Sequence, residues 1–299
     1  MRQQFVIGID GGGTRCRALL QDINGNELGR AEAGPANIMS NAQQAMSSIL
    51  TACKSVIAQT SLPIPLKDVS VCAGVAGANV PEAKSHFLTL EHPFAELTVI
   101  SDAHAACLGA HGGSEGVLII CGTGSSGTAY FDGAFTDKGG YGFNIGDQAS
   151  AAWLGQKSVQ HALLAFDDVQ KRSELSSRVI DYLEVTTPLQ LVQAVSTYTP
   201  DAFGKLAPIA VQAMENGCHI SHGLIAEGAT YLTSLTKSLL ASTNTMLPLC
   251  VVGGMAPIYL PLVEKSLKEQ LVSPKFDAQH GAIFFPTMKD SYYAVHHSR

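Results

Sequence analysis

The stretch Asp10-Gly11-Gly12-Gly13-Thr14 places a carboxylate, three consecutive glycines and a hydroxyl between two apolar runs. Glycines let another group approach the main chain closely, and successive N–H groups in such a turn can converge on an anion. Three glycines cost conformational entropy where a two-residue turn would reverse the chain, so we favour a phosphate-binding loop over a plain hairpin turn. Thr14 adds a hydroxyl donor. Asp10 fits if Mg²⁺ or its water shell lies between the carboxylate and the phosphate.

A second glycine-rich stretch, Gly122–Gly127, has the sequence GTGSSG and matches the dinucleotide-binding pattern G-x-G-x-x-G. In that fingerprint the glycines open a helix. Here the β-forming residues Thr128–Phe131 follow and lead to an Asp-Gly turn. We therefore predict strand, loop, strand, which leaves a dinucleotide oxidoreductase as a distant alternative. The first glycine loop (Gly11–Thr14) lacks the Lys-Ser/Thr ending of a P-loop, which disfavours a P-loop nucleotidase.

The elements that must position these loops follow an α/β pattern. Asn24-Gly25 is a strong hairpin turn between two strand-like runs. We expect strands at 5–10, 15–22, 27–33, 68–78 and 97–101, and helices at 39–60, 81–90 and 103–111. From Gly116 the order strand, glycine loop, strand begins again. Beyond Gly146 the chain is largely helical, from about 147, until a strand at 249–256 and a further helix to about 270. This repeated order predicts a mixed α/β protein of two similar lobes.

Length and composition set the limits of function. The chain has 299 residues and is 46% hydrophobic, enough for two domains, which we place at 1–112, joined by about 285–299, and at 113–284. The net charge is -6 with no run of Lys or Arg, so nucleic acid and anionic membranes are poor partners. No signal-peptide pattern or membrane-spanning apolar stretch is present, and we expect a cytoplasmic protein. The seven cysteines form no C-x-x-C pair, and we expect buried thiols.

Three motifs, IDGGGT, CGTGSSG and VVGGMA, resemble the phosphate-1, phosphate-2 and adenosine motifs of the sugar kinase, chaperone and actin superfamily. With SDAHAACLGAH and GGYGFNIGDQASAAWLG, they occur in the expected order over nearly the whole chain. The sequence is thereby similar to the BadF/BadG/BcrA/BcrD ATPase group, which includes N-acetylglucosamine kinase and bacterial glucosamine kinase. The resemblance implies a two-lobe actin-like α/β fold with duplicated RNase H-like domains and an interlobe cleft. It also implies ATP and Mg²⁺ as cofactors, and transfer of phosphate to the 6-hydroxyl of an amino sugar.

The resemblance further implies a role for each motif. Asp102 matches the base that accepts the proton of the sugar hydroxyl, and such a residue mostly orients the attacking oxygen. Asp10 would position Mg²⁺ through water. The ATP phosphates would contact Gly11, Gly12, Gly13, Thr14, Gly122, Thr123, Gly124 and Ser125. The sugar would contact Asn37, Asp102, Thr123, Tyr141 and Asp147. The adenosine would lie against Gly253 and Gly254.

Plainer explanations stay open for several of these residues. Asp102 and Asp147 suit helix starts, Asn37 suits a turn, and Tyr141 suits a loop plug. The commoner family pattern Gly-Asp-Glu-Gly-Ser is Gly-Asp-Gln-Ala-Ser here, with Gln148 and Ala149, so one charge expected near the sugar or metal is absent. The choice between N-acetylglucosamine and glucosamine stays open.

An alternative of another class is a non-catalytic, ATP-dependent activator or sugar sensor. Related proteins gate electron transfer through an iron–sulfur cluster shared by two chains, which requires exposed thiolates. The embedded cysteines disfavour this role. The sequence allows a homodimer but does not fix the oligomeric state.

Overall fold

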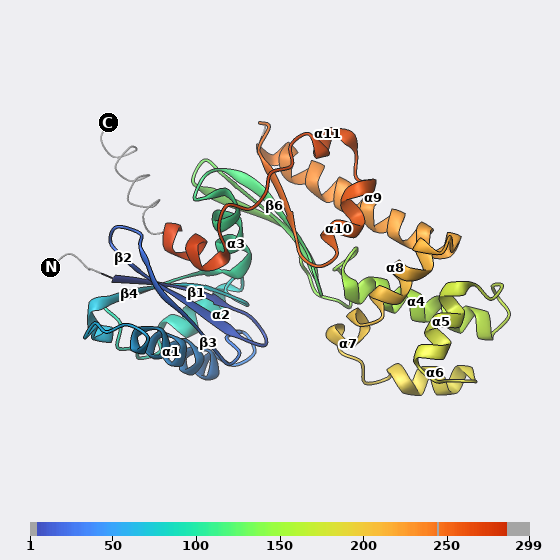
Figure 1. Ribbon diagram of the computed structural model, residues 1–299, viewed down its shortest axis with the longest axis horizontal. Coiled ribbons are helices and arrows are strands. Elements are labelled where there is room, and N and C mark those ends of the chain that lie inside the picture. Colours follow the sequence, from blue (N-terminus) through green and yellow to red (C-terminus); the bar gives the residue numbers. More distant parts are fainter. Residues whose placement is uncertain (1–4, 244, 286–299) are drawn as a thin grey trace. The chain divides into compact units, whose positions relative to one another are not determined.

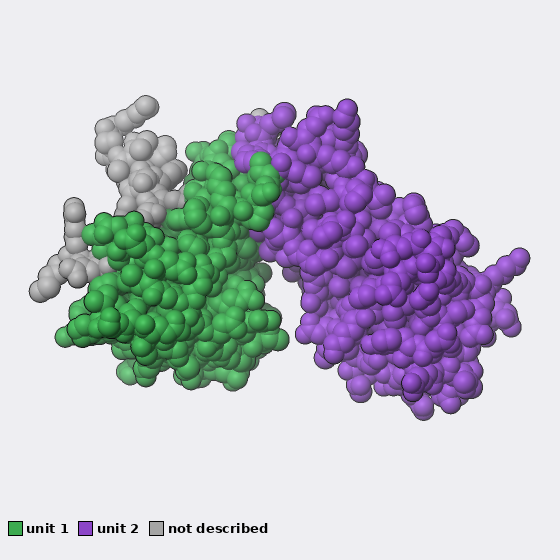
Figure 2. Space-filling model, viewed as in Figure 1, with its two compact units in different colours: residues 1–116, 128–136, 272–299 green, residues 117–127, 137–271 purple. Residues whose placement is uncertain are grey.

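The computed structural model describes residues 5–243 and 245–285, which divide into two compact units (Figures 1 and 2). Among these residues, unit 1 contains 5–116, 128–136 and 272–285, and unit 2 contains 117–127 and the described part of 137–271. The lobe limits 1–112 and 113–284 stay a prediction. The segment at about 285–299, which we expect to rejoin the first lobe, lies outside the described residues except for Phe285.

Unit 1 is built on a five-stranded mixed sheet with strand order β3-β2-β1-β4-β5. Its strands are β1 (Phe5–Gly11), β2 (Cys16–Asp22), β3 (Glu27–Ala33), β4 (Val69–Val75) and β5 (Glu96–Ser101). The first three form an antiparallel meander, whereas β4 runs parallel to β1 and β5 runs parallel to β4. The predicted meander followed by alternating helices and strands is confirmed. This order brings the carboxyl ends of β1, β4 and β5 to one edge.

Helices cover this sheet because each presents an apolar or small-residue face. They are α1 (Ala42–Ala58), η1 (Leu66–Asp68), α2 (Pro81–Leu88) and α3 (Asp102–His111). The side chain of Asn41 caps α1 by accepting the N–H of Gln44, and buried residues at helical spacing, such as Ile49 and Val56, join the core. A Cβ on Gly109 of α3 would lie 2.0 Å from the carbonyl oxygen of Asp277. The small residues of α3 therefore let the segment 272–285, helical from 278, lie against it.

Unit 2 and the hairpin that leaves it contain a four-stranded sheet with strand order β8-β7-β6-β9. Its strands are β6 (Gly116–Cys121), β7 (Ser125–Phe131), β8 (Ala134–Gly139) and β9 (Leu249–Val252). β6 and β9 are parallel. Asp132 and Gly133 join β7 to β8 with φ angles of 49° and 73°, as a two-residue hairpin turn requires. The order repeats β3-β2-β1-β4 of the first sheet, which confirms the predicted recurrence, including strand, loop, strand at the second glycine loop.

The rest of unit 2 is helical, as predicted beyond Gly146. Its helices are α4 (Ala151–Phe166), α5 (Glu174–Tyr182), α6 (Pro188–Val195), α7 (Pro200–Gly204), α8 (Ala207–Glu215), α9 (His219–Thr243), α10 (Ala256–Tyr259), η2 (Leu260–Leu262) and α11 (Lys265–Lys268). The expectation of one helix between β9 and about residue 270 is wrong, since two short helices and a 3₁₀ turn occupy that stretch. Pro261, which cannot donate a helical N–H bond, lies within that turn. Within the described residues, no helix has the length and apolarity needed to cross a membrane.

Candidate functional site

In unit 1, the segments that follow β1, β4 and β5 lie side by side. Gly11 pairs with Val75, and Val75 pairs with Ser101, so the three strands end in register. Open α/β sheets bind ligands beyond the carboxyl ends of their parallel strands. The first glycine loop and Asp102 therefore lie at the edge where a ligand is expected.

The three glycines of the first loop differ in what surrounds them. A Cβ on Gly11 would lie 2.9 Å from both the Ala36 Cβ and the Val75 Cγ1, so internal packing requires glycine there. A Cβ on Gly12 would meet no atom closer than 3.9 Å, and one on Gly13 none within 4 Å. Neither residue has a positive φ. Gly12 and Gly13 thus have no internal reason to be glycine, and their main chain is open to an approaching group.

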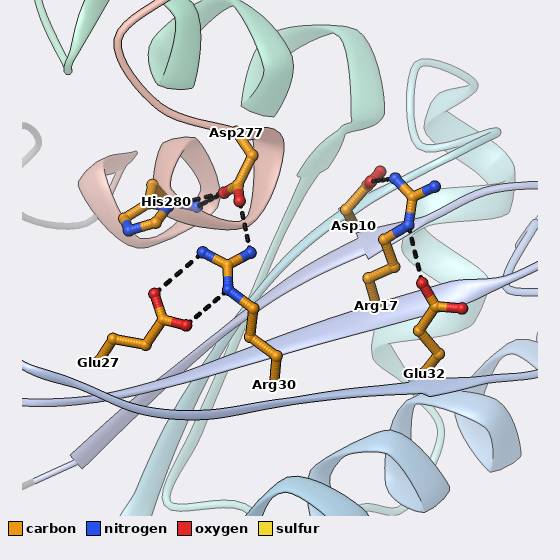
Figure 3. A network of polar contacts seen from close by, with 7 residues as sticks. All are labelled: Asp10, Arg17, Glu27, Arg30, Glu32, Asp277 and His280. Atoms are coloured by element: carbon orange, nitrogen blue, oxygen red, sulfur yellow. Dashed lines mark hydrogen bonds and ion pairs between the residues drawn. The ribbon is translucent and has the colours of Figure 1, made fainter.

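Asp10 lies at the end of β1, and its carboxylate is 25% exposed. Its Oδ2 accepts a hydrogen bond from the Arg17 Nη1 at 3.2 Å, and the Arg17 Nε pairs with Glu32 at 3.3 Å (Figure 3). Burial raises the pKa of Asp10, Arg17 partly opposes that rise, and the negative charge of Asp102 adds to it. With one strand between β1 and β5, the two backbones are separated by about 10 Å. Asp10, predicted to position Mg²⁺, and Asp102, the predicted base, are therefore close enough for their charges to interact.

Asp102 is the first residue of α3, but it is not the cap of that helix. The Ser101 side chain accepts the N–H of His104 at 3.1 Å and fills the cap position. Asp102 Oδ1 accepts the N–H of Ala103 at 2.9 Å. The helix N-terminus stabilises a carboxylate at this position. The plainer explanation, a helix cap, thus belongs to Ser101, and the role of Asp102 as a base stays a prediction.

Asn37 occupies a turn beside the first glycine loop. Its Oδ1 accepts the N–H groups of Met39 and Ser40 at 3.0 and 3.1 Å. Next to it, the Ala36 N–H donates to the Gly12 carbonyl at 2.8 Å. The turn explanation is therefore correct for the amide oxygen. The Nδ2 group makes no hydrogen bond to the described residues and can donate to a ligand hydroxyl.

In unit 2, the predicted phosphate-2 and adenosine motifs converge in the same way. The Ala151 N–H donates to the Gly122 carbonyl at 2.8 Å, and the Met255 N–H donates to the Cys121 carbonyl at 3.0 Å. Ile120 pairs with Val252, so β6 and β9 end together. The second glycine loop thus lies between the segment before α4 and the segment after β9.

The glycines of these motifs again separate into two kinds. Gly253 has a φ of 105°, and a Cβ there would lie 2.3 Å from the Cys121 carbonyl oxygen. A Cβ on Gly122 or Gly254 would meet nothing within 4 Å, and neither φ is positive. Gly253 is therefore required by the path of the chain. Gly122 and Gly254 leave open main chain on the neighbouring ends of β6 and β9.

Asp147 lies in a loop, so its alternative assignment to a helix start is wrong: Ser150 caps α4 by accepting the Trp153 N–H at 3.0 Å. Burial raises the pKa of Asp147, and hydrogen bonds from the backbone N–H groups of Ser125 and Gly142 partly oppose that rise. Its φ is 60°, in the left-handed region that non-glycine residues rarely adopt. Asp147 therefore ties its own loop to the second glycine loop.

Thr123 and Ser125 differ within that loop. Thr123 is exposed, whereas Ser125 is 3% exposed and its hydroxyl donates to the Gln148 carbonyl at 2.5 Å. Because its N–H also binds Asp147, both hydrogen-bond donors of Ser125 are used within the chain. The predicted phosphate contact of Ser125 stays a prediction that this arrangement disfavours.

Two tyrosines lie near Asp147, and sequence reasoning identified only one of them. Tyr141 is 76% exposed between Gly140 and Gly142, both with positive φ, so it is no buried plug. Tyr231 of α9 lies close enough that the charges of Asp147 and Tyr141 add to the burial that raises its pKa. In sequence, Tyr231 is one aromatic residue in a long helix, which is typical of a core position. Tyr231 lies at the candidate site because α9 packs beside the loop that contains Tyr141 and Asp147.

Comparison with known proteins agrees with this arrangement. Residues 7–285 match the BadF/BadG/BcrA/BcrD ATPase family. The chain is 32% identical to the glucosamine kinase GspK of Vibrio cholerae over 282 residues, covering 94% of this chain and 95% of that protein. It is 28% identical to the N-acetyl-D-glucosamine kinase of Dictyostelium discoideum over 274 residues, covering 85% of this chain and 86% of that protein.

Solved structures share the fold. A candidate N-acetylglucosamine kinase from Chromobacterium violaceum superimposes with a TM-score of 0.85 at 28% identity, covering 94% of this chain and 98% of that one. A glucokinase of the ROK family from Streptomyces griseus, solved with glucose and AMPPNP, superimposes with a TM-score of 0.53 at 15% identity, covering 95% and 98%. The actin-like fold of sugar kinases expected from the sequence is thereby confirmed.

Proposed function

The chain belongs to the BadF/BadG/BcrA/BcrD ATPase family, and we propose that it is an ATP-dependent kinase that phosphorylates the 6-hydroxyl of glucosamine or N-acetylglucosamine. Relatives named glucosamine kinase and N-acetyl-D-glucosamine kinase support the amino-sugar class. The products are ADP and the sugar 6-phosphate.

One observation carries the nucleotide-binding part of this proposal. Gly12, Gly13, Gly122 and Gly254 have no positive φ and no close neighbour in the Cβ direction. Glycine where alanine would fit the backbone costs about 0.4–1 kcal/mol at each position, because it makes the unfolded chain more flexible. That cost is explained if phosphates and adenosine lie where Cβ atoms would be. The N–H groups of the first and second glycine loops, with the Thr14 and Thr123 hydroxyls, then bind phosphate oxygens.

Asp10 fits a role in holding Mg²⁺ together with ATP. Within the described residues, no group of three His, Cys, Asp or Glu side chains forms a metal site. Mg²⁺ usually keeps several waters and takes one or two carboxylates plus substrate phosphates, so a single partly exposed carboxylate suffices. When bound, the ion would neutralise charge on the phosphates. Asp10 would hold it through water while Arg17 keeps the carboxylate oriented.

Asp102 is the proposed base. It would accept a hydrogen bond from the sugar 6-hydroxyl and take its proton as the oxygen attacks the γ-phosphorus. Orientation matters most in this reaction, because phosphoryl transfer depends on positioning and charge neutralisation. The Asp102 carboxylate is suited to that task because it lies on the first turn of a helix whose cap is supplied by Ser101.

The sugar itself is assigned to polar and aromatic groups around these loops. Asn37 would donate its amide N–H to a hydroxyl. Asp147 uses two of about four lone-pair positions for backbone N–H groups, which leaves acceptor capacity for a sugar hydroxyl. Thr123 would add a hydroxyl contact, and Tyr141 would stack on the sugar face.

The test is ADP release from Mg-ATP with glucosamine, N-acetylglucosamine, glucose and N-acetylmannosamine. We expect turnover with an amino sugar, and a decrease in kcat of about 10²–10⁴-fold in Asp102→Asn, the range that general base catalysis supplies. ATP affinity should be unchanged in that variant. Asp68→Asn, which changes an exposed carboxylate of the same unit, is the matched control.

Two results would contradict the proposal. If ATP binds and no sugar increases ADP release, the protein is a non-catalytic ATP-dependent activator or sugar sensor. If turnover survives in Asp102→Asn, the kinase assignment holds but Asp102 is not the base. The activator would also need several accessible thiolates for a shared cluster, whereas all seven cysteines are buried and Cys218, which lines a groove, is only 7% exposed.

A further inference from the structure

Cys218 differs from the other cysteines in its surroundings. It directly precedes α9, a 25-residue helix, and lines an open groove of about 580 Å³ in unit 2. Lys171, Arg172 and His219 line the same groove. Helix N-termini and neighbouring cations are the two features that favour a thiolate over a thiol. Both occur here beside one sulfur.

The groups that face the sulfur are hydrogen-bond donors. Burial alone would raise the pKa of Cys218, but N–H groups of Ser221 and Leu175, the Ser221 hydroxyl and the Ile220 N–H lower it more, so the result is below the usual value. Burial raises the pKa values of Cys16, Cys72 and Cys121 to about 12. Deprotonation to the thiolate is therefore easier at Cys218 than at those three cysteines.

The Ser221 hydroxyl is an independent indication of the same chemistry. Ser221 is completely buried, and its Oγ has no hydrogen-bond partner of good geometry among the described residues. A buried hydroxyl without a partner costs about 1–3 kcal/mol. It lies near enough to the Cys218 sulfur to lower the pKa of that thiol as a donor. A negatively charged sulfur would give this orphaned donor its acceptor.

We propose that Cys218 is a redox modification site that exchanges with an anionic low-molecular-weight disulfide of the oxidised glutathione class. The groove has the volume of a small-molecule site. The side chains of Lys171 and Arg172 would attract the carboxylates of such a molecule, and Glu174 is already occupied by Arg178 and Asn216. Cys218 is 7% exposed and lines this groove, which offers a route to its sulfur.

The exchange needs no further reactant. The Cys218 thiolate attacks one sulfur of the disulfide, and a new bond forms between the two sulfurs. The original disulfide bond breaks, and its second half leaves as a thiolate with the bonding electron pair. Cys218 is oxidised to a mixed disulfide, the leaving thiol is reduced, and a reducing thiol reverses the step.

The experiment uses the full-length native protein and peptide mapping by mass spectrometry. The protein is incubated at pH 7 with oxidised glutathione, with the neutral 2-hydroxyethyl disulfide, or with the cationic cystamine. We expect an adduct on Cys218 in preference to the other six cysteines. Reaction with oxidised glutathione should exceed that with cystamine by on the order of tenfold, a ratio typical of electrostatic steering, and the excess should fall with added salt.

Variants separate the two parts of the proposal. Lys171→Gln with Arg172→Gln should remove the preference for the anionic disulfide over the neutral one. Ser221→Ala should move the pH midpoint of the neutral reaction upward. Mapping of the native protein needs no variant to fold. Adducts spread over all cysteines, or none on Cys218 while the urea-unfolded chain reacts, would overturn the site. Equal rates with the anionic and cationic disulfides would overturn the anionic ligand.

Discussion

Gly124→Ala should decrease the stability of unit 2 when Asp147 is present and increase it when Asp147 is replaced by alanine. The reason is that the Asp147 carboxylate lies where the new Cβ would be. A Cβ on Gly124 would lie 2.9 Å from Asp147 Oδ2 and 3.4 Å from its Cγ. The carboxylate cannot yield freely, because it accepts the N–H groups of Ser125 and Gly142. Gly124→Ala should therefore displace it from at least one of these donors. With Asp147→Ala already present, the new methyl group has nothing to displace.

The expected magnitudes follow from the bonds that break. A hydrogen bond to a charged group contributes about 1.5–3 kcal/mol, and partial exposure of Asp147 places the value near the lower end. Gly124→Ala alone should thus destabilise unit 2 by about 1.5–2 kcal/mol. The φ of Gly124 is not positive, so alanine fits the backbone. In the Asp147→Ala background it should stabilise by about 0.4–1 kcal/mol, through reduced entropy of the unfolded chain.

The assay is urea unfolding followed by tryptophan fluorescence. Trp153 is the single tryptophan, it is 6% exposed, and it lies on α4 just beyond this loop, so it reports on unit 2. Gly223→Ala, at an α9 glycine where a Cβ meets nothing within 4 Å, is the control for glycine replacement without a collision. The KM for ATP, measured in parallel, should rise in Gly124→Ala, because the second glycine loop (Gly122–Gly127) loses the hydrogen bond from the Ser125 N–H to Asp147.

Additivity would refute this reasoning. If Gly124→Ala costs the same with and without the Asp147 carboxylate, to within about 0.5 kcal/mol, the two residues do not interact energetically. An effect of Asp147→Ala on the KM for the sugar alone, with unchanged stability, would show that Asp147 serves the substrate and not the loop.

Three further predictions come from other parts of the chain. Tyr259→Phe should stabilise by about 1 kcal/mol in thermal unfolding, because the buried Tyr259 hydroxyl has no partner among the described residues; destabilisation would reveal a hidden bond. Burial raises the pKa of Asp277, but His280 and Arg30 lower it more, so the native value is below the unfolded one (Figure 3). Asp277 therefore stabilises the folded state at pH values above its unfolded pKa, and this stability is lost as the pH falls through its native pKa. Asp277→Asn should be less stable than the native protein at pH 7, and the difference in unfolding free energy should disappear in acid. A difference that stays constant across a pH titration would contradict this linkage. Gly253→Ala should strongly destabilise unit 2 in urea, while Gly254→Ala should keep its stability and raise the KM for ATP; equal stability losses would refute the distinction.

The succession of strands and helices along the chain and the positions of the glycine loops could be predicted because they depend on local signals. Alternating apolar residues, Asn24-Gly25 and the two glycine loops each act within a few residues. The start of α4 could not be placed, because Asp147 and Ser150 are both good helix-cap residues, and the cap is chosen by contacts with the second glycine loop. Tyr231 could not be identified for the same reason, since its neighbours come from distant segments.

The distinction between glycines required by packing and glycines that leave open main chain was also beyond the sequence. Gly11 and Gly12 are adjacent and identical in type, yet only Gly11 is enclosed by Ala36 and Val75. Gly253 and Gly254 repeat that difference at the end of β9. In both motifs the enclosed glycine comes first and the open one second, because the strand end must pack before the chain turns toward the ligand edge.

The two departures from the family pattern next to Asp147 have unequal consequences. Ala149 has a φ of 65° and is completely buried. The left-handed backbone costs alanine about 1–2 kcal/mol, whereas the buried methyl contributes about 0.8 kcal/mol and glycine would lose about 0.5–1 kcal/mol in flexibility. These terms nearly cancel, so alanine can replace glycine without altering the loop. Gln148 contributes its carbonyl to Ser125 whatever its side chain, so the replacement of glutamate keeps that hydrogen bond and exchanges a charged acceptor for a neutral amide. Any difference in preference between glucosamine, which carries a cationic amine, and N-acetylglucosamine, which does not, should therefore be sought in the Gln148 side chain.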